Sequence, residues 1–160
     1  MDLLERILLL IYFPQFSSPN CSRFESFFIS NFKKEKSNNK NISISKNIFP
    51  EKIIRNEDKR TSLLIKGIPK DMSKKEVRDF IEKYGNLNYL YIIQDTNSIE
   101  KNSSIAFVNV INYKSIIPIF MNLRNYKLIK NGQVYNIQIM YSSAQGKEQL
   151  KQYIKQNKNL

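Results

Sequence analysis

The chain has 160 residues, 41% of them hydrophobic, and carries 26 Lys and Arg against 14 Asp and Glu, a formal net charge of +12. It contains no His and a single Cys, which excludes Ser-His-Asp and Cys-His catalysis, zinc sites built on His or several Cys, and a disulfide within the chain. This length suits one domain with additional sequence, and the positive charge favours a polyanionic partner, although AT-rich coding is an alternative source of part of the Lys excess. The cysteine usage indicates a reducing compartment, nucleus or cytoplasm.

Residues 1–32 differ from the rest of the chain. Their apolar run, residues 7–13, ends at Pro14 and is shorter than the ~20 residues that cross a bilayer. Asp2 and Glu5 precede this run, whereas a signal peptide begins with basic residues. We interpret residues 1–32 as a short amphipathic or poorly ordered segment. A membrane or targeting element and a docking peptide are the alternatives.

Residues 33–59 are rich in Lys, Asn and Ser, and residues 33–40 show no apolar period. This composition predicts a basic disordered linker. It serves either as a solvated tether or as an arm that adds phosphate contacts or directs nuclear import.

From Arg60 onward the pattern becomes regular. Residues 62–66 predict a strand, and the capping box from Ser73 to Glu76 opens a helix that ends at residues 85–86. Strands are expected over residues 88–93 and 104–111, on either side of a polar loop at 95–103. Residues 113–123 predict a second helix, with a kink or late start at Pro118.

The last part of the chain contains a turn signal at Asn131-Gly132, between residues 128–129 and 134–135. Residues 135–141 alternate as a final strand, and residues 147–155 predict an amphipathic terminal helix. The predicted buried stripes of the three helices are Val77, Phe80, Ile81 and Tyr84; Ile116, Ile117, Phe120 and Leu123; and Leu150, Tyr153 and Ile154.

This order of elements is βαββαβ with an extra C-terminal helix. It predicts an α+β, ferredoxin-like domain over residues 60–160, with a four-stranded antiparallel sheet and two packed helices. Because side chains alternate across a strand, Ala106, Val108 and Val110 should face the helices and Phe107 the opposite side. By the same alternation Leu63, Ile65, Ile137, Ile139 and Tyr141 should point inward.

The open face of this sheet then combines aromatic rings, one cation and amide groups. Its predicted members are Leu64, Lys66, Tyr89, Tyr91, Ile105, Phe107, Asn109, Gln138 and Met140. Rings stack on bases, Lys neutralises phosphate and amides read base edges, so the face suits single-stranded RNA. The alternative for Phe107 is a sheet residue covered by the terminal helix or by the linker.

Two segments carry a resemblance to a known family. Residues 63–68 and 103–110 resemble the two RNP motifs of RNA-recognition motif (RRM) domains, whose usual stacking positions fall at Leu64, Ile105 and Phe107. Residues 60–69, R-T-S-L-L-I-K-G-I-P, resemble the R-T-T-L-M-I-K-N-I-P opening of the C-terminal RRM of the Mei-two-like, meiosis-associated RNA-binding proteins. Residues 116–120 resemble the second helix of that domain, and residues 141–147, Y-S-S-A-Q-G-K, its Y-A-R-I-Q-G-K signature.

The resemblance implies a non-enzymatic RNA-binding module, with a direct RNA role for Gln145 and Lys147. A simple turn at Gly146 is the alternative reading of the same three residues. We expect a monomer without cofactor or metal, with single-stranded RNA as partner and no membrane association. The second hypothesis is a protein-interaction module on an RRM scaffold, in which Leu64, Ile105 and Met140 form an apolar patch for a protein partner.

Overall fold

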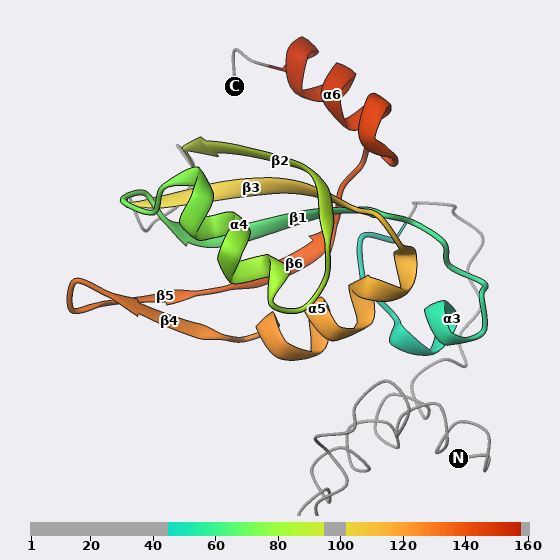
Figure 1. Ribbon diagram of the computed structural model, residues 1–160, viewed down its shortest axis with the longest axis horizontal. Helices are drawn as coiled ribbons and strands as arrows, with labels where there is room; N and C mark the ends of the chain where they lie inside the picture. The colour runs from blue at the N-terminus through green and yellow to red at the C-terminus, as the bar shows by residue number, and fades with distance from the viewer. Residues whose placement is uncertain (1–44, 95–101, 158–160) are drawn as a thin grey trace, which may run out of the picture. The chain divides into compact units, whose positions relative to one another are not determined.

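The computed structural model describes residues 45–94 and 102–157 of the chain (Figure 1). The predictions for residues 1–32, for residues 33–44 and for loop residues 95–101 lie outside these described residues. The elements in chain order are α3 (Pro50–Ile54), β1 (Ser62–Pro69), α4 (Lys74–Glu82), β2 (Leu87–Gln94), β3 (Ser103–Val110), the 3₁₀ helix η2 (Tyr113–Ser115), α5 (Ile116–Leu123), β4 (Lys127–Lys130), β5 (Gln133–Asn136), β6 (Gln138–Tyr141) and α6 (Lys147–Gln156).

Four antiparallel strands form the main sheet in the order β2-β3-β1-β6. This is the strand order of the ferredoxin-like fold, so the predicted fold class is confirmed. The pairing of β1 with β3 shifts between Ile65 and Ile68, around Gly67. Gly67 has φ +80°, and a Cβ there would overlap the carbonyl of Asn136. Glycine therefore allows β1 to bend close to the end of β5.

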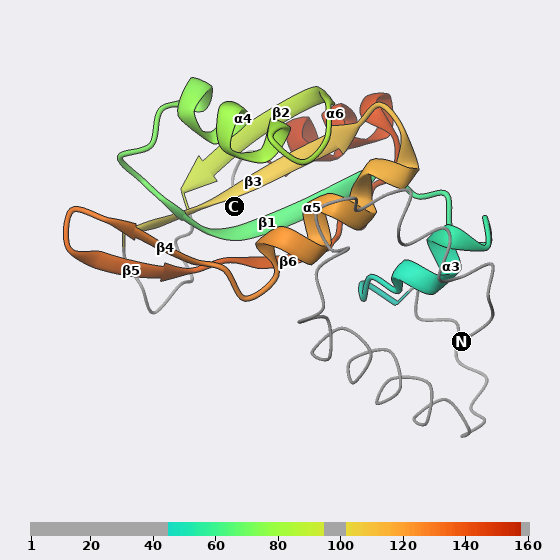
Figure 2. The same ribbon diagram turned by 60° about the horizontal axis from the view of Figure 1, so that its bottom comes forward.

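Helices α4 and α5 cover one face of this sheet (Figure 2). The predicted capping box is present, because Ser73 Oγ accepts from the Glu76 amide and the Glu76 carboxylate accepts from the Ser73 amide. These bonds and nearby Lys130 lower the pKa of Glu76 to about 2. The core between the helices and the sheet contains the inward residues predicted for β1 and β3. Its fully buried members include Leu63, Ile65, Val77, Ile81, Ala106, Val108, Ile116, Ile119, Leu123 and Ile137.

The second helix begins late, as predicted. A 3₁₀ turn precedes α5, and Pro118 lies in the first turn of α5, where its missing N–H is not needed. The predicted buried stripe was wrong at one position, since Ile119 is buried and Phe120 is half-buried. A Cβ on Gly85 would contact Ser115 and Ile119, so the close approach of residue 85 places Ile119 in the core.

The strand predicted over residues 135–141 is divided. β5 pairs with β4 in a hairpin, and β6 pairs with β1 in the main sheet. The predicted turn is confirmed, because Asn131 and Gly132 have φ of 51° and 75°, as a tight hairpin requires. The division occurs at Ile137, whose amide donates to the carbonyl of Tyr126 at the open end of the β4–β5 hairpin, whereas the next residue, Gln138, pairs with Lys66 of β1.

The expectation of a disordered linker over residues 33–59 was wrong for its last part. Helix α3 buries Ile53, and Ile48 is also buried. The amide of Tyr141 donates to the carbonyl of Lys46, which extends the contacts of β6. Ile48 and Ile53 supply the apolar surface that holds this segment, although its composition is polar overall. In the described part of the chain, no helix is long and apolar enough to cross a membrane.

Candidate nucleic-acid interface

A row of four directly paired residues crosses all four strands of the main sheet. Tyr91 pairs with Phe107, Phe107 with Leu64, and Leu64 with Met140. Alternation places this row on the face opposite α4 and α5, because the neighbours Ala106, Val108, Leu63 and Ile65 are in the core. The sheet therefore brings together side chains from four strands, as predicted from the sequence.

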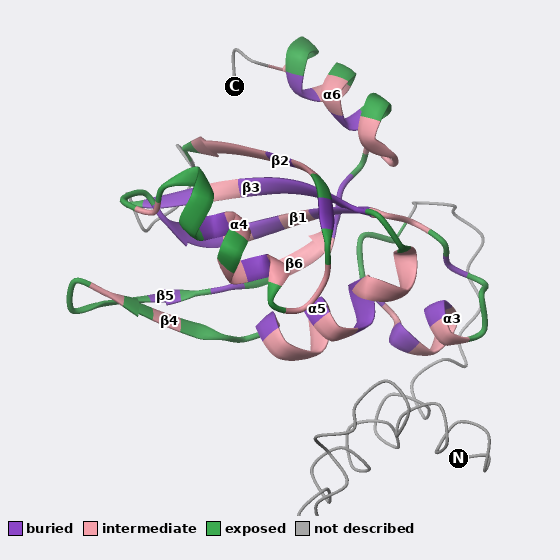
Figure 3. Ribbon diagram, viewed as in Figure 1, coloured by how far each residue is buried: buried purple, intermediate pink, exposed green. Residues whose placement is uncertain are grey.

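Helix α6 covers the β2–β3 part of this face. Phe107 on β3 forms a buried cluster with Leu150 and Ile154 of α6, and only 7% of Phe107 is exposed. Half-buried hydrophobic residues pack against this cluster: Leu64, Tyr89, Tyr91, Ile93, Ile105, Ala144 and Tyr153. Figure 3 shows α6 with buried and exposed residues alternating around its axis.

The prediction that Phe107 and its neighbours lie on an open face was therefore wrong for the described fold. The alternative, a sheet residue covered by the terminal helix, is the arrangement that the structure shows. The physical reason is that α6 must bury the apolar side formed by Leu150, Tyr153 and Ile154. We refer below to Tyr89, Tyr91 and Phe107 as the covered platform.

The β1–β6 part of the face is less covered. Lys66 pairs with Gln138, and Met140 follows two residues later on β6. Gln138 is exposed, and Lys66 and Met140 are half-buried. None of the three belongs to the cluster under α6. We refer to Lys66, Gln138 and Met140 as the open strip.

Asn109 was predicted to face the ligand, but its amide group is committed to the protein. Its side chain is buried, and Oδ1 accepts from the hydroxyls of Thr61 at 2.8 Å and Ser62 at 2.7 Å. Nδ2 donates to Oδ1 of Asn88 at 2.8 Å and to the carbonyl of Val110 at 3.1 Å. The predicted role of Asn109 in reading bases is wrong for this conformation, because both of its polar atoms already have partners.

The side-chain amide of Gln145 is likewise fully hydrogen-bonded within the protein. Its Oε1 accepts from the amides of Thr61 at 3.1 Å and Ser62 at 2.9 Å, and its Nε2 donates to the carbonyls of Ser62 at 3.0 Å and Ser142 at 2.7 Å. The predicted direct contact of Gln145 with RNA is therefore not available here, and the side chain instead ties the segment before α6 to β1. Gln145 is structural because its side chain bonds to backbone groups of Thr61, Ser62 and Ser142 just after β6 ends.

The two residues after Gln145 begin the terminal helix. The amide of Gly146 donates to Ser62 Oγ at 2.9 Å, and Gly146 has φ +83°. This confirms the alternative reading of a turn that needs glycine. Lys147 is the first residue of α6 and is half-buried.

One cluster near this segment was missed by the sequence reasoning. The guanidinium of Arg60 lies over the ring of Tyr141, with 3.6 Å from Cζ to the ring centroid. It donates from Nε and Nη2 to the carboxylate of Asp58 at 3.0 and 2.7 Å, and from Nη1 to the carbonyl of Ser45 at 2.7 Å. The spacing of Asp58 and Arg60, two residues apart just before a strand, could have indicated their ion pair. Only the tertiary fold places Tyr141 beneath Arg60.

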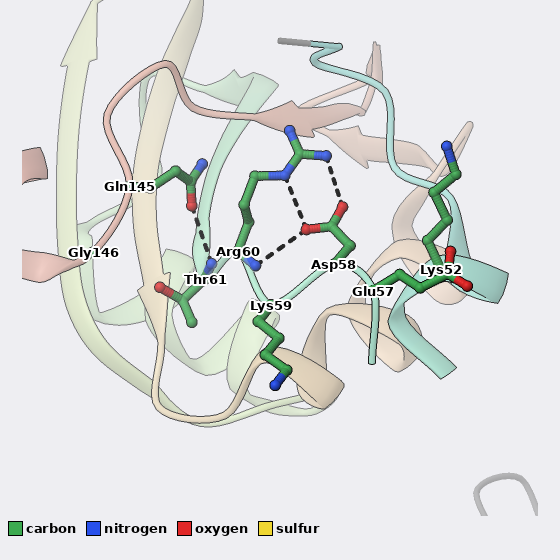
Figure 4. A pocket seen from close by; sticks show the side chains of 8 residues that line it. All are labelled: Lys52, Glu57, Asp58, Lys59, Arg60, Thr61, Gln145 and Gly146. Atoms are coloured by element: carbon green, nitrogen blue, oxygen red, sulfur yellow. Dashed lines mark hydrogen bonds and ion pairs between the residues drawn. The ribbon is translucent and has the colours of Figure 1, made fainter. Parts of the chain in front are cut away.

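Burial and bonding shift the ionisation of this cluster. Burial alone raises the pKa of Asp58, but the hydrogen bonds and charge of Arg60 outweigh it, so the pKa lies below its usual value. Burial raises the pKa of Tyr141. Figure 4 shows the ion pair beside Gln145 in an open pocket. The pocket is lined by Lys52, Glu57, Asp58, Lys59, Arg60, Thr61, Gln145 and Gly146.

Acidic and basic side chains both line this pocket. Because their charges oppose each other, the pocket is not a selective site for an anion. Its acidic groups do not form a metal site either: over residues 45–94 and 102–157, no group of three or more His, Cys, Asp and Glu side chains could hold a metal ion.

Comparison with known proteins gives a family match for most of the domain. The family model described as RNA recognition motif 2 matches residues 60–155. Protein MEI2-like 5 of Arabidopsis thaliana is 31% identical over 134 residues, 81% of this chain and 17% of the relative. Protein MEI2-like 4 of the same organism is 31% identical over 102 residues, 62% of this chain and 11% of the relative.

The chain therefore spans less than a fifth of the length of these curated relatives. A solved structure described as the Rna15 RRM with bound RNA (GU) is 19% identical, with a TM-score of 0.45, and covers 59% of this chain and 96% of its own.

Proposed function

Because this chain belongs to the RNA recognition motif 2 family, we propose that it binds single-stranded RNA on the sheet face opposite α4 and α5, with help from basic residues. The family match confirms the resemblance of residues 60–160 to the Mei-two-like RRM. The observation that carries the proposal is the open strip, in which half-buried Lys66 pairs with exposed Gln138 and Met140 follows on β6.

The open strip provides the first contacts in this proposal. The Lys66 ammonium neutralises a phosphate, and the exposed Gln138 amide bonds with a base edge. Met140 offers a polarizable apolar surface for a base, next to Leu64. These contacts need no change in the described fold.

The charge of the domain supports the same partner. Residues 61–160 contain 15 Lys and Arg against 7 Asp and Glu. Such an excess attracts a polyanion over a distance and neutralises phosphates on contact. We propose that Lys66 and Lys147 contribute locally, and that the domain acts as a monomer in the nucleus or cytoplasm.

The experiment is RNA binding by the full chain, measured by fluorescence anisotropy with a labelled pool of random single-stranded RNA. Affinity should fall with salt, with a log–log slope of ~0.7 for each phosphate contacted. Lys66→Ala should weaken binding and reduce this slope by ~0.7, because one phosphate contact is lost.

The matched control is Lys75→Ala, which removes the same charge from an exposed position on α4, on the other face of the sheet. Equal losses for the two variants would contradict a site on the proposed face. An affinity that does not depend on salt would contradict RNA binding through basic residues.

The second hypothesis, a protein-interaction module, has less support. Its apolar patch was Leu64, Ile105 and Met140, but Leu64 and Ile105 already pack against the cluster that Phe107 forms with Leu150 and Ile154 of α6. The chain's own helix thus occupies most of the surface that a partner helix would need.

A further inference from the structure

Helix α6 lies where bases would stack on Tyr89, Tyr91 and Phe107. Building on the proposed function, we propose that α6 is a displaceable cover and that it competes with RNA for the covered platform, turning about Gly146. In this mechanism RNA first engages the open strip, and the aromatic rings become available when α6 leaves the sheet.

The attachment of the segment before α6 is polar and ends at Gly146. Gln145 makes four hydrogen bonds to residues 61, 62 and 142, and the amide of Gly146 donates to Ser62. Asn109 supports this anchor, because its Oδ1 accepts from the Ser62 hydroxyl. The start of α6 therefore stays on β1 while the helix beyond it moves.

The attachment of α6 itself is apolar. Within the described residues, the side-chain bonds of α6 are internal to the helix, from Lys151 to Glu148 and from Asn157 to the carbonyl of Tyr153. Leu150 and Ile154 of α6 form the apolar cluster with Phe107 of the sheet, and Tyr153 packs against it. Such contacts can be exchanged for stacked bases without leaving a buried polar group unpaired.

The residue between the two attachments is suited to a pivot. Gly146 has φ +83°, and an added Cβ would have no atom within 4 Å. Gly146 is the N-cap residue of α6, and no side chain caps this end of the helix. The space beside residue 146 is therefore open, and no side-chain capping bond holds the start of α6.

Competition has a measurable consequence. The apparent affinity of a ligand is its intrinsic affinity reduced by the fraction of molecules in the competent state. Weakening the cover raises that fraction, so it should strengthen RNA binding. If α6 were instead a fixed part of the RNA site, weakening its packing would weaken RNA binding.

The first experiment uses the full chain with Leu150→Ala and Ile154→Ala combined, and the same random single-stranded RNA pool. We expect binding to become about tenfold tighter or more, and tenfold corresponds to about 1.4 kcal/mol. Adding Phe107→Ala should remove this gain. The control is Gln152→Ala, at an exposed position of α6, with unchanged affinity. Unchanged or weaker binding by a folded double variant would overturn the proposal.

A second measurement is independent of affinity and changes one buried residue of α6 instead of two. Ile154 is 6% exposed, so a thiol in its place is protected while α6 covers the sheet. In a Cys21→Ser background, saturating RNA should raise the alkylation rate of Ile154→Cys and leave that of Gln152→Cys unchanged. A protected thiol at RNA saturation would overturn the displacement of α6 while RNA binding stands. Absence of RNA binding in the wild type and in all variants would overturn the proposed function itself, and the competition with it.

Discussion

The ring of Tyr153 on α6 packs against the ring of Phe107 on β3, with 6.2 Å between the ring centroids and 51° between the ring planes. Tilted pairs at this separation are favourable arrangements of two aromatic rings. Tyr153 thus occupies one side of the aromatic residue that RRM domains usually use for stacking. The contact links the terminal helix directly to the proposed RNA site.

Phe107→Ala should destabilise the domain. The ring is buried with Leu150 and Ile154, so its removal leaves a cavity and should cost about 3 kcal/mol or more of unfolding free energy. Urea denaturation of the variant and the wild type measures the difference. A change within ~0.5 kcal/mol would instead indicate an exposed ring, as the strand alternation alone had suggested.

Residues 45–59 should contribute to stability. A chain that begins at residue 60 loses the buried side chains of Ile48 and Ile53 and the bond from Arg60 Nη1 to the carbonyl of Ser45. It should be about 3 kcal/mol or more less stable than a chain that begins at residue 45, because each buried side chain contributes ~1.5–3 kcal/mol. Thermal and urea melts compare the two. Ile48→Ala with Ile53→Ala in the longer chain should reproduce much of the loss, and equal stability of the two chains would contradict the packing of this segment.

Gln145→Ala should weaken the anchor of α6. The substitution leaves the amides of Thr61 and Ser62 without their acceptor, which should cost about 1–3 kcal/mol. Hydrogen exchange of the α6 amides should become faster, because the start of the helix is less constrained. Ser143→Ala, at an exposed position two residues earlier, is the control. A variant with normal stability and exchange but lost RNA affinity would restore Gln145 as a direct RNA contact.

The ion pair of Asp58 and Arg60 should make stability depend on pH in the acid range. The pKa of Asp58 is lower in the folded protein than its ordinary value of 3.8, so the carboxylate stabilises the fold above that value. This contribution is lost as the pH falls through the lower, folded-state pKa. Unfolding free energies from pH 7 down to pH 3 should fall less steeply for Asp58→Asn than for the wild type. Parallel pH profiles would show that the pair does not contribute.

Several elements could be read from the sequence because their signals are local. The capping box from Ser73 to Glu76 satisfies amides within one helical turn, and the Asn131-Gly132 turn needs only its own backbone angles. The alternation of β3 similarly predicted which residues share a face, and Ala106 and Val108 are in the core. Ile119 and the division of the last strand were missed because each depends on residues outside its element. Gly85 lies close to Ile119, and β6 pairs with β1 while β5 pairs with β4.

By itself, the sequence determined the order of α4, α5, α6 and the strands of the main sheet, the face on which Phe107 lies and the basic charge of the domain. It did so because hydrophobic period and capping depend on residues a few positions apart, and net charge depends on composition alone. Only the tertiary structure decided that α6 covers Phe107, that Asn109 and Gln145 bond to β1, and that residues 48–53 join the core. These contacts join residues 40 or more positions apart, so no local pattern of the sequence specifies them. The burial of apolar surface that holds α6 and residues 48–53 depends on which surfaces meet in the fold, not on neighbours in the sequence.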